Sequence, residues 1–495
     1  MMAPRSAQPS HAAAAAADAA SQGVTKTLSH WIHSVTLDDV PEDVRTRAKY
    51  LILDGLGCAI VGAHLPWTET AARAIFDLEP QGNCWVWGWQ RKLGPLAAAL
   101  LNSTSVQAFE LDDYHSEAPV HSNSILLPAL FAAARQTNKT TTCDGASFLL
   151  ATIVGYETGP RVGLALHGGH MLSRGWHSGV VFGHAAAAAA VSKLLNLTEG
   201  AIEDALGIAC TQACGLMSAQ FGSDVKRMQH GFAARNGLFA ALMARANYGG
   251  IKRVFEEPYG GFLAVFGQGS GMNPPYRTDE VAKQLGEKWQ LQTIRVKPYA
   301  SMAGTHCTID CVRELQRKHP EQMRQVERIR GIKIEMSEAA FKHGGWKPRR
   351  PLTATGAQMS AAYVAAVQLV DGQVLPSEFR PSLLDRDSLW SLIDKTECVH
   401  AEEMDPGYAQ RVTITFEQQQ EQQQGTLTQT LQAPKGVSPA LTNEEILDKW
   451  RRFTEGLIED RRRDEIEALV LNLEKLDDVS VLEDLLAGET LNPIA

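Results

Sequence analysis

The chain has 495 residues, of which 44% are hydrophobic and 21% are charged. This length allows two to four domains, and the composition is that of a globular chain, which excludes a largely disordered one. The formal net charge of -9 excludes the basic surface that nucleic acid or an anionic membrane requires.

Residues 1–22 form an alanine-rich tail without an apolar core segment, which argues against a signal peptide and a membrane anchor. A mitochondrial targeting helix would carry several arginines, and this tail has only Arg5. We therefore expect a disordered tail on a cytoplasmic protein.

Residues 23–267 are predicted to be mostly helical. One helix should begin at Pro41, because proline suits the first turn and the acidic residues that follow favour the positive end of the helix dipole. The alanine run 185–190 predicts a helix with little side-chain bulk, able to pack tightly inside a bundle. Thr198 is a capping residue that predicts the start of the next helix.

The pattern changes after residue 267. Residues 268–275 are rich in Gly and Pro and predict a linker. Strands are then predicted at residues 294–296, 332–336, 412–416 and 426–431. The glutamine-rich residues 418–425 would be the hairpin loop between the last two strands; low complexity without such a role is the alternative.

Helices return from residue 442 onward and have no sheet of their own, so they should pack back on the first helical region. We therefore expect a mainly α fold: a large discontinuous all-helical domain with an inserted, smaller α+β lid. The helical domain would comprise residues 23–291 and 435–486, and the lid residues 292–434. The cleft between them is the expected ligand site.

Sequence motifs exclude several classes of site. No phosphate-binding loop, dinucleotide fingerprint, paired CxxC or GxSxG elbow is present, and no stretch approaches the ~20 apolar residues of a membrane-spanning helix. The eight cysteines are too scattered for a disulfide framework, which fits a reducing compartment. Cys210 and Cys214, like Cys307 and Cys311, have helical spacing and are interpreted as buried small side chains rather than metal ligands. We expect no metal and no cofactor.

The segment from Glu110 to His121 contains four acids, two histidines and a tyrosine within twelve residues. Carboxylates so close together would repel one another if all were buried and ionised, so some must be paired or protonated. Pro119 indicates a loop at a helix end, from which side chains could face a cleft. A solvated loop with surface charges is the alternative.

Cations occur at three other places. His177 follows Arg174 and a glycine turn, Lys226 precedes His230, and Lys297 follows a predicted strand and precedes His306. Each lysine alone is most simply a surface residue, and each histidine a hydrogen-bonded core residue. Together they supply the positive charge that a site for a small polyanion needs.

Three segments resemble the MmgE/PrpD family: LDDYHSEAP at 111–119, ALGIACTQACGLMSAQ at 205–220 and QHGFAARNG at 229–237. The resemblance extends from about residue 23 to 486 and includes SAAYVAAVQLVD at 360–371. It implies a helical domain with an α+β lid, homodimerisation and cofactor-free lyase chemistry on a small tricarboxylate. Family members decarboxylate cis-aconitate or dehydrate 2-methylcitrate and alkylcitrates.

The same resemblance implies the site residues. His121, Lys226, Lys297 and Tyr114 would be catalytic, and substrate would contact Asp112, Asp113, His177 and His115. Some relatives have Asp at Glu110 and Thr at Tyr114. Others have Tyr near Trp346 or a different run in place of residues 301–305. These differences concern the pocket wall, so they bear on substrate identity more than on reaction class.

Decarboxylation of cis-aconitate to itaconate is the preferred reaction. Loss of CO2 leaves negative charge beside a second carboxylate, so fixed cations lower the barrier, with Lys226 and Lys297 as candidates. An acid must then deliver a proton, and His121 is the candidate because histidine has the ordinary pKa nearest neutrality. Dehydration of 2-methylcitrate or an alkylcitrate needs nearly the same groups and is the alternative. A third hypothesis is a non-catalytic protein that binds anions. The joint presence of His121, Lys226 and Lys297 argues against it.

Overall fold

The computed structural model describes residues 23–136, 143–405, 407–417 and 425–495. The expected disordered tail therefore lies outside the described residues, as does most of the glutamine-rich loop. Within the described part no single helix is long and apolar enough to cross a membrane. Only α3 (Glu42–Gly62) and α4 (Pro66–Leu78) taken together satisfy that criterion, and they are bent by 84°.

The first helical part is built on residues with helical periodicity. Its helices are α2 (Val24–Ser34), α3 (Glu42–Gly62), α4 (Pro66–Leu78), α5 (Pro95–Val106), α6 (Ser122–Ala134), α7 (Gly145–Ala165), α8 (His170–Ser173), α9 (Ser178–Leu194), α10 (Glu199–Cys210), α11 (Val225–Arg245) and α12 (Phe262–Gly267). Helix α3 begins directly after Pro41, as predicted. The Thr198 side chain accepts a hydrogen bond from the Ala201 amide and caps α10.

Helix α9 lies at the centre of this bundle and packs against α7, α10 and α11. All six alanines of its run are buried. The small side chains allow a close helix approach: a Cβ atom added to Gly237 of α11 would lie 2.4 Å from the Ala187 Cβ of α9. Close packing of α9 and α11 places His230, which α11 carries, against the start of α9.

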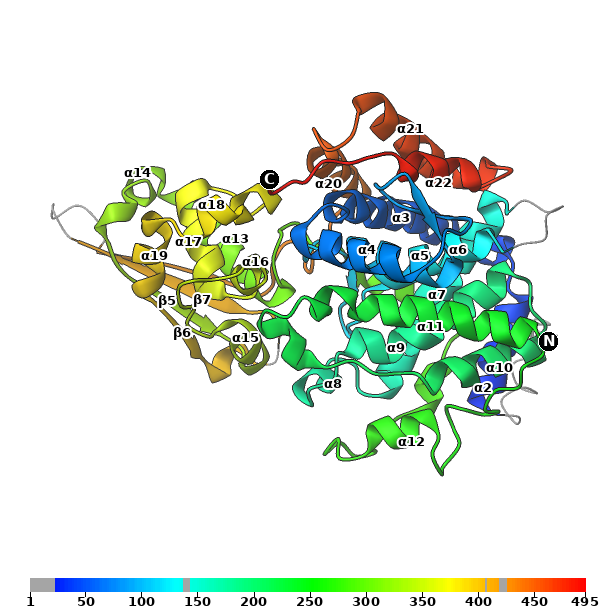
Figure 1. The fold of residues 1–495 in the computed structure, drawn as a ribbon. Coiled ribbons are helices and arrows are strands. Elements are labelled where there is room, and N and C mark those ends of the chain that lie inside the picture. The colour runs from blue at the N-terminus through cyan, green and yellow to red at the C-terminus, as the bar shows by residue number, and fades with distance from the viewer. Residues whose placement is uncertain (1–22, 137–142, 406, 418–424) are drawn as a thin grey trace, which may run out of the picture.

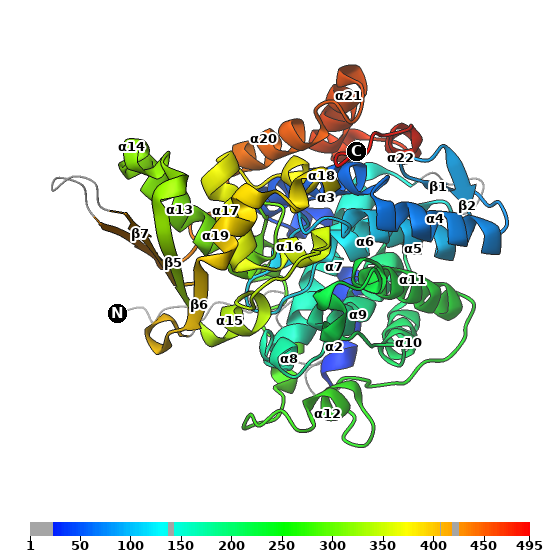
Figure 2. The ribbon, with the colours of Figure 1, turned by 60° about the vertical axis from the view of Figure 1, so that its left-hand side comes forward.

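The mixed part follows, with one four-stranded sheet in the order β6-β5-β7-β8. Its strands are β5 (Ile329–Met336), β6 (Thr396–His400), β7 (Gln410–Phe416) and β8 (Thr426–Leu431). Only β5 and β6 are parallel, so this is no doubly wound parallel sheet. Its helices are α13 (His306–Lys318), α14 (Pro320–Met323), α15 (Glu338–Gly344), α16 (Ala354–Gln358), α17 (Ala361–Asp371), α18 (Pro381–Leu384) and α19 (Asp387–Asp394). Figure 1 shows these elements together at one end of the molecule, and in the turned view of Figure 2 the strands and α13–α15 lie on the left.

The C-terminal helices return to the first helical part. They are α20 (Asn443–Thr454), α21 (Asp460–Leu471) and α22 (Ser480–Ala487). Helices α20 and α21 pack against α3, nearly 400 residues earlier in the chain, in agreement with the predicted return. Single 3-10 turns complete the described secondary structure: η1 (Leu37–Asp39), η2 (Met217–Phe221), η3 (Thr278–Val281), η4 (Gln290–Thr293), η5 (Ala303–Thr305), η6 (Val326–Arg328), η7 (Pro376–Phe379), η8 (Glu402–Met404) and η9 (Leu473–Lys475).

The mainly helical character is confirmed, but the first part is not all-helical as expected. It contains a hairpin of β1 (Cys84–Val86) and β2 (Arg91–Leu93), and β3 (Tyr114–His115) pairs with β4 (Ile294–Arg295). The hairpin turn is fixed by tertiary contacts, because its Gly88 and Gln90 amides donate to carbonyls of α22. Cys214 also differs from its prediction, since it lies beyond the end of α10 and is exposed.

Candidate active site

The acidic segment is a short connection between α5 and α6. Glu110 has a left-handed backbone with φ of 56°, an uncommon conformation for a residue with a side chain. His121 is the N-cap residue of α6. This connection turns successive acidic side chains toward different neighbours, so the four acids do not share one environment.

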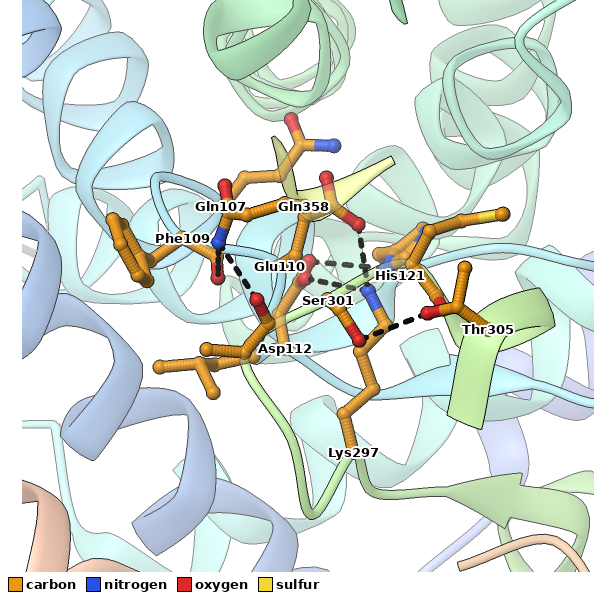
Figure 3. Close-up of polar contacts among 12 residues, drawn as sticks. Gln107, Phe109, Glu110, Asp112, His121, Lys297, Ser301, Thr305 and Gln358 are labelled. Atoms are coloured by element: carbon orange, nitrogen blue, oxygen red, sulfur yellow. Dashed lines mark hydrogen bonds and ion pairs between the residues drawn. The ribbon is translucent and has the colours of Figure 1, made fainter. Parts of the chain in front are cut away.

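The Glu110 carboxylate is shared by three cations. One oxygen accepts from Lys226 and from Arg227, whose Nη1 lies 2.6 Å away. The other accepts from Lys297 at 3.1 Å (Figure 3). Burial opposes ionisation, but the three cations outweigh it and hold the pKa of Glu110 well below its usual range. Glu110 is therefore ionised although only 4% of its surface is exposed.

Asp112 orients the candidate proton donor. One of its oxygens lies 3.1 Å from His121 Nδ1, and the other lies 3.6 Å from Lys297 Nζ. Burial is again outweighed, here by His121 and Lys297, and the pKa of Asp112 is lowered. Because Asp112 engages Nδ1, the other ring nitrogen of His121 is left to face a reacting group.

The two lysines respond differently to burial. Desolvation lowers the pKa of Lys226 to about 8, and Arg227 and Lys297 act in the same direction. Desolvation also opposes the charge of Lys297, but Glu110 and Asp112 together raise its pKa above the ordinary value. The fixed charges are three cations and two carboxylates, so the cluster has a net positive charge suited to an anion.

Three histidine rings meet beside the lysines. The ring of His230 lies 4.9 Å from that of His121 and 4.9 Å from that of His177, measured between centroids. Burial holds the pKa of His177 at about 3 and that of His230 well below its ordinary value. Both rings are therefore neutral neighbours of His121.

The hydrogen bonds of His230 fix its tautomer. The Ser124 hydroxyl donates to the His121 carbonyl at 3.0 Å and lies 2.9 Å from His230 Nδ1. That hydroxyl has one proton, so it must accept from His230 Nδ1–H. The other nitrogen of His230 then accepts from the Gln107 amide at 3.4 Å. This chain of contacts connects His230 to the backbone of His121.

The structure brings five predicted site residues together: Asp112, His121, His177, Lys226 and Lys297. It places the other three elsewhere. Asp113 is fully buried and accepts from the Tyr156 hydroxyl at 2.8 Å and the Asn123 amide at 3.0 Å, and burial raises its pKa well above the usual range. Its contacts are those of a structural residue at the α6–α7 junction.

Tyr114 and His115 lie on β3. The Tyr114 hydroxyl pairs with Tyr408, although its ring centroid is 6.3 Å from that of His121. His115 is enclosed by Gln290, at 3.2 Å from Nε2, and by the backbone amides of Glu117 and Ala118. Burial lowers the pKa of His115 to about 4. The loop conformation, which the sequence pattern does not specify, turns this histidine away from the lysines.

Sequence reasoning did not assign a role to four residues of the site: Glu110, Arg227, His230 and Gln358. Glu110 belongs to the acidic segment, and Arg227 and His230 adjoin Lys226, so their unusual clustering was a usable signal. Gln358 gave none. It lies on α16 and is fully buried; its amide donates to the Phe109 and Ala300 carbonyls, and its oxygen accepts from Arg227 at 2.7 Å.

The wall beyond Lys297 is polar. Ser301 is fully buried, and its hydroxyl lies 3.0 Å from that of Thr305 (Figure 3). His306 Nε2 contacts the Ser301 carbonyl at 3.0 Å, and burial lowers the pKa of His306 to about 3. Among the described residues, no group of three or more His, Cys, Asp or Glu side chains is arranged to hold a metal ion.

The arrangement suits a reaction that builds negative charge and then consumes a proton. Two lysines with unused donors can bind carboxylates and stabilise a developing carbanion or enolate. A histidine positioned by a carboxylate can transfer the proton. The residues come from the connection before α6, the N-cap of α9, helix α11 and the segment after β4, so the cluster forms only in the folded chain.

Comparisons with known proteins cover both parts of the chain. Residues 26–274 match the MmgE/PrpD N-terminal domain and residues 299–475 the MmgE/PrpD C-terminal domain. The chain is 52% identical over 475 residues to the cis-aconitate decarboxylase-like protein oryM of Aspergillus oryzae, across 94% of this chain and 98% of that protein.

Two further relatives are named cis-aconitate decarboxylase. The Aspergillus terreus protein is 46% identical over 485 residues, with 96% of this chain and 98% of that protein covered. The Homo sapiens protein is 25% identical over 486 residues, with 96% of each chain covered. Both similarities therefore extend over the helical and the mixed parts.

Proposed function

Because the chain belongs to the MmgE/PrpD family, we propose that it is a cofactor-independent lyase that decarboxylates cis-aconitate to itaconate. The observation that carries this proposal is the buried cluster of Lys226, Lys297 and the Asp112–His121 pair. The relatives of highest identity reported above, whose names refer to this activity, support the choice of substrate.

The reaction follows from this cluster. The bond to the carboxylate of the CH2 arm breaks and CO2 leaves; the bonding electron pair forms a double bond to the central carbon. The electrons of the former double bond move to the neighbouring CH carbon, where the adjacent carboxylate accepts the charge. Lys226 and Lys297 stabilise that carboxylate, and His121 protonates the carbon. One trianion and one proton thus give one dianion and CO2.

Product NMR tests the proposal and its alternative together. The protein is supplied with cis-aconitate in one tube and 2-methylcitrate in another. Itaconate and CO2 from the first tube are the expected result. Loss of water from 2-methylcitrate without CO2 release from cis-aconitate would contradict decarboxylation and favour the dehydratase.

The mixed part is proposed to act as the lid, with the boundaries at about residues 292 and 434. Gln358 and Thr355 of α16 contact Arg227 of α11, which supports a site that both parts complete. We propose that the Asp113, Tyr114 and His115 side chains stabilise the loop that carries Glu110, Asp112 and His121.

A homodimer is also proposed. Ile75, Leu78, Leu96 and Phe239 line an apolar groove of about 430 Å³, and Leu78 is 80% exposed. A second copy would cover this surface. Sedimentation equilibrium should find a dimer, which Leu78→Lys weakens while Leu491→Lys, at another exposed leucine, does not. A monomeric wild-type protein would contradict it.

The proposed location is the cytoplasm, because all eight cysteines are free thiols, as a reducing compartment requires. Fractionation of cells that produce the tagged full-length protein tests this, and recovery in an organelle would contradict it.

A further inference from the structure

Glu110 has no role in the reaction proposed above, yet its carboxylate contacts more cations than the other acid of the site, Asp112. Its two carboxylate oxygens accept from three cations: Lys226, Arg227 and Lys297. Both terminal nitrogens of Arg227 are engaged by protein: Nη1 donates to Glu110, and Nη2 donates to Thr355 and Gln358. These two nitrogens therefore hold Glu110 in place, and the buried Nε has no partner among the described residues.

Lys226 and Lys297 are the other two cations at Glu110. Each ammonium group has three donors. Among the described residues, Lys226 pairs with Glu110, and Lys297 pairs with Glu110 and Asp112. Each lysine therefore has a donor left for a bound anion. Since they contact different oxygens of one carboxylate, Glu110 determines how far apart their free donors lie.

The backbone is consistent with a fixed role. Glu110 is held at a left-handed φ of 56° by the surrounding contacts, a conformation that costs free energy in a residue with a side chain. The Phe109 carbonyl just before it accepts from Gln358 of α16 (Figure 3). The first helical part and the mixed part thus both help to fix the position of the Glu110 carboxylate.

We propose that Glu110 is a positioning residue: its carboxylate bridges Lys226 and Lys297, sets the separation of their free donors, and limits the positive charge that a tricarboxylate meets. This rests on the proposed function. Without the bridge, two ammonium groups and a guanidinium would repel one another within a buried volume.

The bridge has a measurable consequence for pH dependence. The charged and titratable neighbours of Lys226 are Glu110, Arg227, Lys297, His177 and His230, and Glu110 alone among them favours the charged lysine. A trianion binds the charged form, so binding should fall as pH rises through the Lys226 pKa of about 8. Removing the Glu110 charge moves this fall to lower pH.

The test compares Glu110→Gln with Glu157→Gln. Glu157 is also a buried glutamate paired with an arginine, at 3.3 Å from Arg161, but it lies outside the lysine cluster. Citrate binding by calorimetry and turnover of cis-aconitate are measured between pH 6 and pH 9.5. In Glu110→Gln, the pH at which citrate binding is half lost on the alkaline side (the midpoint) should fall by about one pH unit. Its kcat should fall at least ~10-fold, because the lysines are misplaced. Glu157→Gln should lower Tm but leave the midpoint unchanged.

Glu110→Asp separates position from charge. It retains the carboxylate, so the midpoint should stay near that of the wild type while kcat falls. An unshifted midpoint in Glu110→Gln, or wild-type kinetics in its folded fraction, would overturn the inference. If Glu110→Gln does not fold, a wild-type kcat in Glu110→Asp overturns it. If the wild-type protein binds citrate but releases no CO2 from cis-aconitate, the proposed function is contradicted and the role of Glu110 is not. The pH dependence of citrate binding still tests that role.

Discussion

His121 and His115 lie on the same short segment, but their surroundings predict different roles. His121 is a half-buried ring between Asp112 and His230, whereas both nitrogens of His115 are occupied by Gln290 and by backbone amides. A histidine with one nitrogen left over can exchange a proton with substrate. A histidine with both nitrogens in protein contacts stabilises the loop.

We therefore expect His121→Gln to lower turnover by ~10²-fold or more, the scale of a lost acid–base catalyst, with little change in Tm. His115→Gln is the matched control: it should lower Tm, while the folded molecules retain near-normal kcat. Melting temperature and turnover are measured on the same preparations. A destabilised but fully active His121→Gln would remove His121 from the mechanism.

Lys226 and Lys297 differ in what their charges do for stability. The folded-state pKa of Lys226 is about 8, below the ordinary 10.5, so the unfolded chain binds more protons between these values. Its charge thus opposes folding below pH 8, and this penalty is relieved as pH rises. The pKa of Lys297 is raised, so its charge stabilises the fold below its unfolded pKa, and that contribution is lost above the folded one.

Lys226→Met and Lys297→Met should both weaken substrate binding and lower turnover, because each removes a cation that faces a polyanion. Their melting temperatures at pH 7 should diverge. Lys226→Met should melt at or above the wild-type temperature, since Arg227 and Lys297 still neutralise Glu110; Lys297→Met should melt below it. A lower Tm in Lys226→Met than in Lys297→Met would contradict the assigned charges.

At the scale of elements, residues of α6 and α7 hold Asp113, which lies on the loop that carries the site. The Tyr156 hydroxyl on α7 lies 2.8 Å from Asp113 and 2.5 Å from the Asn123 side chain of α6, all within the buried core. The hydroxyl has one proton and can donate to only one of these two groups. Removing it still leaves a buried polar group without its partner, which costs free energy.

Tyr156→Phe should therefore lower the free energy of unfolding by about 1–3 kcal/mol. Tyr363→Phe is the control, because the Tyr363 hydroxyl is buried without a hydrogen-bond partner in the described part of the chain. That substitution should be neutral or stabilising. Urea denaturation of both variants measures the difference, and equal losses would show that the Asp113 network contributes nothing special.

The helical character of the first and C-terminal parts and the strands β4, β5, β7 and β8 were predicted, and their physical basis is local; β6 (Thr396–His400) was not predicted. Alternating burial in β5, the Pro41 start of α3 and the alanine-rich α9 follow from periodicity and capping, which the sequence contains directly. The pairings β1–β2 and β3–β4 were not predicted. They are two or three residues long and depend on partners such as α22, so no local pattern specifies them.

On the scale of the whole molecule, the C-terminal segment is tied to the site loop. Lys449 of α20 pairs with Asp54 of α3 at 2.6 Å and donates to the Leu111 carbonyl at 2.7 Å. Burial raises the pKa of Asp54, and Lys449 opposes this rise. Three segments far apart in the sequence therefore share one buried cation.

Lys449→Met should destabilise the protein by ~3–5 kcal/mol, because it leaves a buried acid without its partner. Adding Asp54→Asn should recover part of the loss, since the unpaired charge is then removed as well. Chemical denaturation of the two single variants and the double variant measures the coupling. Strictly additive losses would contradict a shared buried pair.

The sequence by itself determined the helical character, the return of the C-terminal helices and, through resemblance to a family, most of the residues that meet in the site. Only the tertiary structure decided which of the clustered acids are paired with cations and which one has its pKa raised by burial. Glu110 and Asp112 face cations, whereas Asp113 faces Tyr156 and Asn123 in a site of equal burial. The physical reason is that the charge state of a buried group depends on its desolvation and on the few groups within contact distance. Those groups come from residues 226–227, 297 and 156, and only folding places them beside the acids.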